Sequence, residues 1–442
     1  MKLEIENLSE VRRKLRIEVP SEEVTQEVDR AYREMGKKAK VKGFRPGKVP
    51  RGVLELYYKK QVEQEVSDTL VRRSVGEALR EQALEPVGLS WPEALPPVVA
   101  GQDYRFSVEV EVPPEFTVSD YLGLELAAPA VEVTEDMVDQ RLEEVRQSNA
   151  VLRPPAEPRG IQEGDIIILD YEGFFAGRPV DGGKGTETYL EVGAGRLGPE
   201  FDQQLLGLNA GAETTMTVTM PPDYFHPLMA GKVVDFRVKV HDIKVKEEPD
   251  LDDAFARSLG GNFQGLPDLR QAVREDIIKV KERERQARLE TQVLDQLLSR
   301  TPFEAPPSLV RQEQENLVRE QWEHLQSQGF QVMGLDPAKM VEGAKPQAER
   351  RVKVRFLLEK IAAQEGLSVD EAELDAGLAR VAAGSGRDPA QVRQFYQEKQ
   401  LLEVLRRQLR DEKVMKLLLE KAHIGAGPAP EQAAAEAAAE QD

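Results

Sequence analysis

The sequence predicts a multidomain α+β protein with an N-terminal α+β domain, a small antiparallel β domain with a short helix, and an extended all-α C-terminal region. The chain has 442 residues, and a single compact domain is usually shorter than this. Residues 163–245 are rich in glycine, β-branched and aromatic residues, which is typical of strands and turns. From about 250 to 423, apolar residues recur at three- or four-residue steps between charges, which indicates helices.

The N-terminal domain is expected to span residues 1–112. Apolar and polar residues alternate over 11–19 and again over 104–112, which predicts two half-buried strands. The patterns of 21–41 and 51–84 between them are helical. Two prolines follow and close the domain.

Residues 113–162 form a connecting segment. It contains a strand-like piece at 124–133 and then a helix for which Thr134 is the expected N-cap. In the β domain, strands are expected at 166–171, 214–220 and 233–243.

The helical region begins with an expected helix at 266–300, which at ~1.5 Å per residue would be about 50 Å long. A helix of that length protrudes or pairs with another helix. Further helices are predicted at 308–328, 346–365, 369–383, 388–397 and 399–422. Residues 424–442 are of low complexity and are expected to be disordered or weakly helical, and no function is assigned to them.

Composition excludes several classes of function. There is no cysteine and there are only four histidines, so a metal site or a Cys or His nucleophile is not expected, and no cofactor is predicted. No stretch is apolar enough for a membrane helix, and the first residues lack the apolar core of a signal peptide, so a cytoplasmic location is expected. A net charge of −19 disfavours DNA or general nucleic-acid binding.

One basic patch departs from this acidic background. Residues 30–60 hold eleven cations against two acids, a local balance of +9. Within the patch, Gly43 to Pro50 read GFRPGKVP, a turn between two helices whose tip presents Phe44, Arg45 and Lys48. One interpretation is an ordinary connector with solvated charges. The other is a preformed loop for an RNA–protein surface, where cations supply affinity and a ring stacks or enters a pocket.

Two other motifs favour structural interpretations. Residues 193–198 match GxGxxG, but a proline follows and no βαβ unit surrounds them, so dinucleotide binding is not expected. Asp250, Asp252 and Asp253 stand at an expected helix start, where acids serve as caps.

The motif GFRPGKVP resembles the signature loop of trigger factor, the family of bacterial ribosome-associated chaperones, and the resemblance extends over nearly all of residues 1–423. It implies that the loop contacts ribosomal protein and rRNA beside the exit tunnel. The residues implied are Gly43, Phe44, Arg45, Pro46, Gly47 and Lys48.

The β domain resembles an FKBP-type peptidyl-prolyl isomerase. The resemblance implies a pocket lined by Tyr171, Phe201, Tyr224 and Phe236 with Asp181 as a polar neighbour. Such a pocket can favour the twisted amide without a nucleophile or metal. Three positions depart from the family pattern: Val180 stands where phenylalanine is usual, Gly198 stands where isoleucine is usual, and the aromatic residue Tyr189 is shifted by one position. Weak turnover is therefore expected, and the alternative is that these aromatics form the barrel core of a module that binds peptide with little turnover.

The helical region, which contains RRVKVRFLLEKIAAQEGLSVDEAEL, resembles the arm domain of the same family. The resemblance implies a substrate cradle, a surface of weak apolar contacts for unfolded chains, with the connecting segment packed among the arms. Candidates for cradle residues are Phe330, Met333, Met340, Phe356 and Leu357, although burial is the alternative for each.

The function implied is a ribosome-associated chaperone that keeps nascent chains open for folding or export and has weak isomerase activity. The domains implied are 1–112 for ribosome binding, 113–162 as connector, 163–245 as FKBP-type isomerase, 246–423 as substrate cradle and 424–442 as tail. Its partners would be the ribosome, nascent and unfolded polypeptides and, off the ribosome, a second copy as a homodimer. Two alternatives remain open: a ribosome-independent folding isomerase with helical substrate-recruiting arms, and helices that serve as an oligomerisation scaffold.

Overall fold

The structure is a computed structural model that describes residues 1–42, 44, 48–92, 95–221, 229–327 and 336–427. The chain divides into two compact units. Unit 1 comprises Met1–Pro129 and Gln286–Asp442, and unit 2 comprises Ala130–Arg285. No helix within the described ranges is long and apolar enough to cross a membrane.

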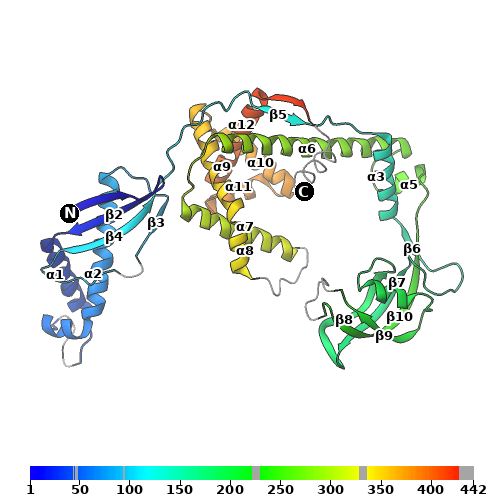
Figure 1. The fold of residues 1–442 in the computed structure, drawn as a ribbon, viewed down its shortest axis with the longest axis horizontal. Coiled ribbons are helices and arrows are strands. Elements are labelled where there is room, and N and C mark those ends of the chain that lie inside the picture. Colours follow the sequence, from blue (N-terminus) through cyan, green and yellow to red (C-terminus); the bar gives the residue numbers. More distant parts are fainter. Residues whose placement is uncertain (43, 45–47, 93–94, 222–228, 328–335, 428–442) are drawn as a thin grey trace, which may run out of the picture. The chain divides into compact units, whose positions relative to one another are not determined.

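The N-terminal part of unit 1 is an antiparallel sheet covered by two helices (Figure 1). The sheet has the strand order β1-β2-β4-β3. Its strands are β1 (Lys2–Asn7), β2 (Arg12–Val19), β3 (Gly88–Ser90) and β4 (Tyr104–Glu111), and its helices are α1 (Ser21–Lys38) and α2 (Arg51–Glu81). The apolar members of the predicted alternation, such as Leu15 and Val108, are buried between sheet and helices.

The core of this domain is mostly apolar and contains a hydrogen-bonded polar pair. Ser67 on α2 and the phenol of Tyr104 on β4 lie 2.6 Å apart and are both buried. Burying the two hydroxyls is tolerated because one donates a hydrogen bond to the other. The expected strands and helices of this domain are confirmed, and β1 and β3 are additional edge strands.

The rest of unit 1 is helical, with a two-stranded parallel sheet beside it (Figure 1). Its elements are β5 (Glu125–Ala128), the C-terminal half of α6 (Leu266–Arg300), α7 (Pro307–Ser327), α8 (Pro337–Gly343), α9 (Lys345–Gln364), α10 (Glu371–Ser385), α11 (Pro389–Glu398), α12 (Leu402–Lys421) and β11 (His423–Ala426). Leu126 of β5 is buried against α6, α9 and α12. On α6, the Gln292 side chain accepts a hydrogen bond from the Ala127 amide (3.0 Å) and donates one to the Ala127 carbonyl (2.7 Å).

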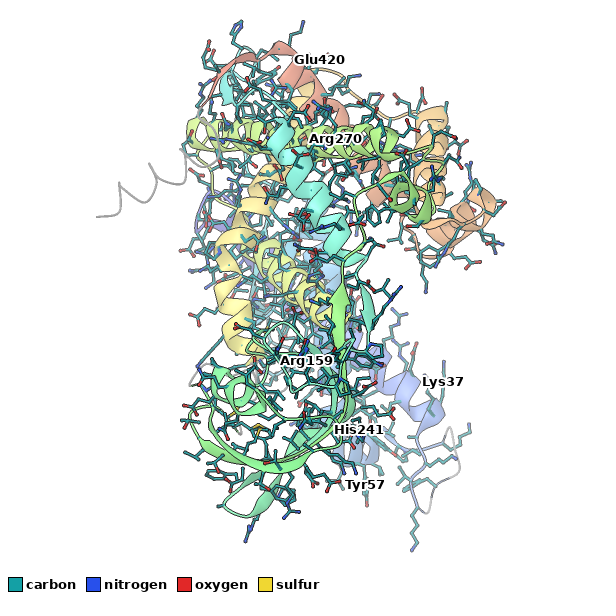
Figure 2. All side chains as sticks on the ribbon, turned by 90° about the vertical axis from the view of Figure 1, so that its right-hand side faces the viewer. Lys37, Tyr57, Arg159, His241, Arg270 and Glu420 are labelled. Carbon is teal, nitrogen blue, oxygen red and sulfur yellow. The ribbon has the colours of Figure 1, made fainter. Side chains whose placement is uncertain are left out.

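Unit 2 contains a small helical cluster and the β domain. The cluster consists of α3 (Glu135–Ser148), α5 (Asp253–Ser258) and the first half of α6, and Val138 and Leu142 of α3 are buried in it. Thr134 caps α3 as expected, and Asp252 caps α5 by accepting from the Phe255 amide at 2.8 Å. Arg270 of α6, labelled in Figure 2, donates to Glu135 of α3 at 3.0 Å.

The β domain is a five-stranded antiparallel sheet with the path β6-β10-β7-β8, and β9 pairs with β10. Its elements are β6 (Val151–Arg153), β7 (Ile166–Phe175), β8 (Arg178–Glu191), the short helix α4 (Pro199–Leu205), β9 (Glu213–Thr219) and β10 (Val233–Glu247). The core lies between the sheet and α4, where Phe201 and Phe236 are fully buried. The predicted multidomain α+β fold with an antiparallel β domain and helical C-terminal region is confirmed.

Candidate functional site

The predicted docking loop joins two helices that Arg51 ties together. Its guanidinium donates to Asp29 of α1 at 2.6 Å and to Glu55 of α2 at 2.8 Å. It also lies over the Tyr32 ring, 5.3 Å from the centroid. Three partners on two helices fix the point where the chain leaves the loop and enters α2.

The described part of the loop is exposed between buried ends. Ala39 and Val49 are buried, whereas Phe44 is 41% exposed. The Phe44 amide donates to the Val41 carbonyl at 3.1 Å, which closes a turn. Lys48 is exposed, while Gly43, Arg45, Pro46 and Gly47 lie outside the described residues.

Most of the described cations around the loop fall into two groups. Arg30 lies 3.8 Å from Glu34, Arg51 pairs with Asp29 and Glu55, and Lys59 lies 3.8 Å from Glu63. The other group is exposed and, within the part of the chain that the structure describes, makes no ion pair. Its members are Lys37, Lys38, Lys40, Lys42 and Lys48, which we call the docking lysines. Arg33 is exposed as well, and its guanidinium donates to the Asp29 carbonyl at 3.2 Å. Most of the local positive charge that the described residues offer a partner is therefore carried by lysines.

Three of the predicted isomerase residues meet inside the β domain. The Phe236 ring on β10 packs edge-on against Phe201 of α4, with centroids 5.3 Å apart, and against Tyr171 of β7, at 6.2 Å. Phe201 and Phe236 have no exposed surface, whereas Tyr171 is half-buried. Tyr224 and the Asp181 side chain lie outside what the structure describes.

Glycines make room for these rings. A Cβ on Gly185 would collide with the Tyr171 ring, and one on Gly173 would come within 3.1 Å of Phe236. At these two positions the strands can pack closely against the aromatic rings only because glycine has no Cβ.

The three departures from the FKBP pattern have distinct positions. Val180 is half-buried against the β-domain core, and Tyr189 is 57% exposed. Gly198 precedes α4 with φ at 102°, a backbone conformation that an isoleucine would adopt only with strain. The glycine is therefore needed by this backbone.

The glycine-rich loop 193–198 binds a side chain of its own domain. Asp202 of α4 is buried, and its carboxylate accepts from the amides of Gly193 (2.9 Å) and Gly195 (2.8 Å). The amides that a phosphate would need are therefore already satisfied by this carboxylate.

One predicted cradle residue is wrong. Leu357 on α9 is fully buried in the core with Leu289 and Val293, so it cannot contact a client in this conformation. Leu357 is buried because residues of α6, α12 and β5 belong to the same core cluster. Phe356 is half-buried against a second cluster that includes Val352, and Met340 of α8 is half-buried. Phe330 and Met333 lie outside the described residues.

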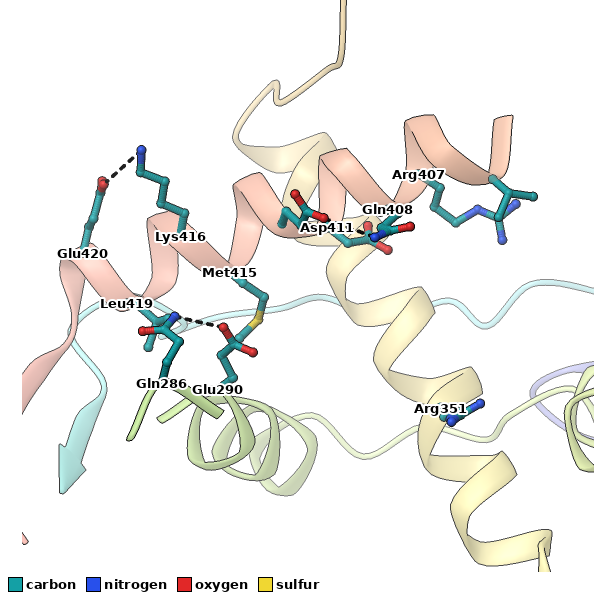
Figure 3. A pocket seen from close by; sticks show the side chains of 12 residues that line it. Gln286, Glu290, Arg351, Arg407, Gln408, Asp411, Met415, Lys416, Leu419 and Glu420 are labelled. Carbon is teal, nitrogen blue, oxygen red and sulfur yellow. Dashed lines mark hydrogen bonds and ion pairs between the residues drawn. The ribbon is translucent and has the colours of Figure 1, made fainter. Parts of the chain in front are cut away.

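Sequence reasoning missed a groove along α6, α9 and α12 (Figure 3). Its volume is about 1200 Å³. Val404, Met415 and Leu419 supply apolar surface, and charged side chains surround them. The lining residues are Gln286, Glu290, Arg351, Val404, Arg407, Gln408, Asp411, Glu412, Met415, Lys416, Leu419 and Glu420. Periodicity could not identify it, because the same apolar spacing places Leu405 and Leu418 of α12 in the core.

Charged side chains of both signs line the groove. Lys416 faces Glu420 at 3.9 Å, and Asp411 lies 3.1 Å from Arg410. Burial raises the pKa of Asp411 even though the neighbouring guanidinium favours its charged form. A groove with both signs of charge around apolar side chains favours a mixed polypeptide ligand over a uniformly charged one.

Comparison with known proteins agrees with this architecture. Three family models match: bacterial trigger factor protein at residues 1–145, its C-terminus at 265–420, and FKBP-type peptidyl-prolyl cis-trans isomerase at 157–241. Trigger factor from Geotalea daltonii is 35% identical over 433 residues, covering 96% of this chain and 98% of that protein. Trigger factor from Geobacter sp. strain M21 is 33% identical over 435 residues, covering 98% and 100%.

A solved trigger factor chaperone structure matches with a TM-score of 0.48 and 21% identity, covering 95% of this chain and 100% of that one. The sequence matches carry the assignment. The fold and site define a protein-folding factor that joins an FKBP-type isomerase domain to helical arms. The chain belongs to the trigger factor family and is a ribosome-associated chaperone with an FKBP-type domain.

Proposed function

We propose that this protein docks on the ribosome through residues 43–50 and acts in the cytoplasm on chains that emerge there. The observation that carries this proposal is the docking lysines beside exposed Phe44, in a chain whose net charge is −19. Such a chain is repelled by RNA except at this surface, so binding depends on one orientation.

The test is cosedimentation of the full chain with ribosomes at low and physiological salt. Phe44→Ala and Lys48→Glu should each weaken binding, and Lys48→Glu should also reduce its dependence on salt. Matched controls are Phe395→Ala, an aromatic residue that is 46% exposed on α11, and Lys339→Glu, an exposed lysine on α8. Equal binding by all four variants would refute docking through this loop.

We also propose that the β domain is a peptidyl-prolyl isomerase of low activity. Tyr171 supports this, because its half-buried ring packs edge-on against the fully buried Phe236 ring and can line a water-poor pocket. In a proline-limited refolding assay, Tyr171→Ala should slow turnover, whereas Tyr189→Ala, in the same domain, should not. Turnover that Tyr171→Ala leaves intact would contradict this assignment.

For the helical region we propose that unfolded chains bind the groove along α6, α9 and α12, and that Met340 and Phe356 contribute beside it. We propose the domain limits 1–112, 113–162, 163–245, 246–423 and 424–442. Suppression of client aggregation tests whether unfolded chains bind the groove. Val404→Asp places a charge on a side chain that is 51% exposed in the groove, so it should weaken suppression, whereas Val233→Asp, at a 54% exposed position in the β domain, should not. Equal suppression by both variants would refute client binding in the groove.

A further inference from the structure

Helix α2 presents an apolar pair to solvent just after the docking loop. Leu56 is 79% exposed and Tyr57 is 67% exposed, which makes them the most exposed large hydrophobic side chains in the part of the chain that the structure describes. The same helix buries Leu54 and Val62 in the domain core. The exposed pair is therefore on the side of α2 that the domain does not use.

Lys60 lies on the same side of the helix. It is four residues after Leu56 and three after Tyr57, so the three side chains are neighbours on one surface, which we call the Leu56 face. Lys60 is exposed and, like the docking lysines, has no ion-pair partner among the described residues. The face is thus apolar with an uncompensated positive charge at its border.

The Leu56 face is close to the docking loop. Leu56 follows the first residue of α2, Arg51, by five positions, which at ~1.5 Å per residue is about 8 Å along the helix. Tyr57 on α2 and Lys37 at the C-terminal end of α1 are labelled in Figure 2. A partner held at the loop can therefore reach this face as well.

The chemistry of the face favours protein over RNA. Bases stack on aromatic rings and guanidinium planes, but a leucine offers them neither. A leucine and a tyrosine together are typical of an anchor that fills an apolar recess on a protein. The lysine selects a recess that has carboxylates at its rim.

We propose that the Leu56 face is a second docking surface, and that its partner is a protein component of the ribosome with an apolar recess bordered by acidic side chains. This inference rests on the proposed docking through residues 43–50. The two surfaces would contribute differently to ribosome binding. The docking lysines supply attraction that depends on salt, and Leu56 and Tyr57 supply apolar contact that depends little on salt.

The first experiment measures ribosome affinity of the full chain at several salt concentrations. The double variant Leu56→Ala/Tyr57→Ala should bind at least tenfold more weakly with an unchanged salt dependence. The matched control is Leu206→Ala/Tyr189→Ala, which truncates a leucine and a tyrosine that are 46% and 57% exposed in the β domain. The control should bind like the parent chain.

The outcomes separate this inference from the docking proposal. If Phe44→Ala and Lys48→Glu weaken binding but Leu56→Ala/Tyr57→Ala does not, the second surface is refuted and docking through the loop stands. If neither set weakens binding, docking through the loop fails and the inference fails with it. Lys60→Glu tests the sign of the charge at the rim of the partner's recess. This charge reversal should weaken binding to an acidic rim and should not weaken binding to a basic one.

The second experiment identifies the partner. Tyr57 is replaced by photoreactive benzoylphenylalanine, and the full chain is irradiated on ribosomes that carry no nascent chain. Crosslinks to a ribosomal protein are expected. Crosslinks to rRNA alone, or none while binding persists, would overturn the assignment to protein.

Discussion

Truncating Phe236 should open the β domain rather than only empty its pocket. The ring has no exposed surface and packs edge-on against both Phe201 and Tyr171. Replacing a buried phenylalanine by alanine typically lowers the free energy of unfolding by about 3–5 kcal/mol. At 1.4 kcal/mol per tenfold, about 4 kcal/mol raises the population of the opened domain by about 10³.

The assay must report on this domain alone. The chain has two tryptophans, Trp91 and Trp322, and neither is in the β domain, so tryptophan fluorescence would miss the event. Amide hydrogen exchange of peptides from 161–243 reports it directly. Phe236→Ala should speed the slowest exchange there by about 10³, while peptides from α2 remain unchanged.

The comparison variant is Tyr189→Ala, whose parent side chain is exposed, so its effect should stay within about 0.5 kcal/mol. Less than tenfold faster exchange in Phe236→Ala would refute the packing argument. If the argument holds, lost isomerase activity in this variant reports domain opening. Half-buried Tyr171 is then the better probe of catalysis.

Three further predictions concern single interactions. Arg159 binds both carboxylate oxygens of Asp165, at 2.7 and 2.9 Å, and holds the pKa of that carboxyl below its usual range. The ion pair should therefore stabilise the β domain fully above the ordinary aspartate pKa of ~4, and this stabilisation should be lost as pH falls through the depressed pKa. Asp165→Asn should flatten this part of a curve of stability against pH, measured by hydrogen exchange. Asp202→Asn removes an anionic acceptor from two glycine amides and should destabilise the β domain by roughly 1.5–3 kcal/mol, visible as faster exchange in 193–205. Gln292→Leu breaks both hydrogen bonds to Ala127 and should free β5, raising exchange in 124–128 by at least fivefold.

Much of the fold could be predicted because periodicity and burial agree. The helix expected at 266–300 is α6 (Leu266–Arg300), and the strands of 11–19 and 104–112 are β2 and β4. Strand β8 (Arg178–Glu191) was not predicted, because its glycines weaken the strand signal while they make room for Tyr171 and other side chains. The disorder expected from residue 424 onward is wrong for 424–426, which belong to strand β11 (His423–Ala426). This strand is short and depends on pairing with β5, far away in the sequence, so local composition could not reveal it.

The candidate sites also include features that the sequence reveals and features that it does not. The basic turn could be found from composition, because a cluster of cations in an acidic chain is visible in the sequence. The burial of individual residues in a helix could not be predicted. Phe356 and Leu357 are adjacent in α9, yet Leu357 is fully buried and Phe356 is half-buried. The exposure of Leu56 and Tyr57 was likewise invisible, since a leucine and a tyrosine in an amphipathic helix are more often core residues.

The way cations are divided around the docking loop suggests why docking can be reversible. Arginine has a planar fork that suits fixed carboxylate geometry, and Arg51 uses it within the domain to join α1 to α2. Lysine is a strongly hydrated point charge on a flexible stem, and the docking lysines are left to solvent. Contacts through such lysines are weak individually and sensitive to salt, so a partner can be released without disturbing the domain that binds it. If selectivity then comes from an apolar anchor such as the Leu56 face, affinity and specificity can change independently of each other.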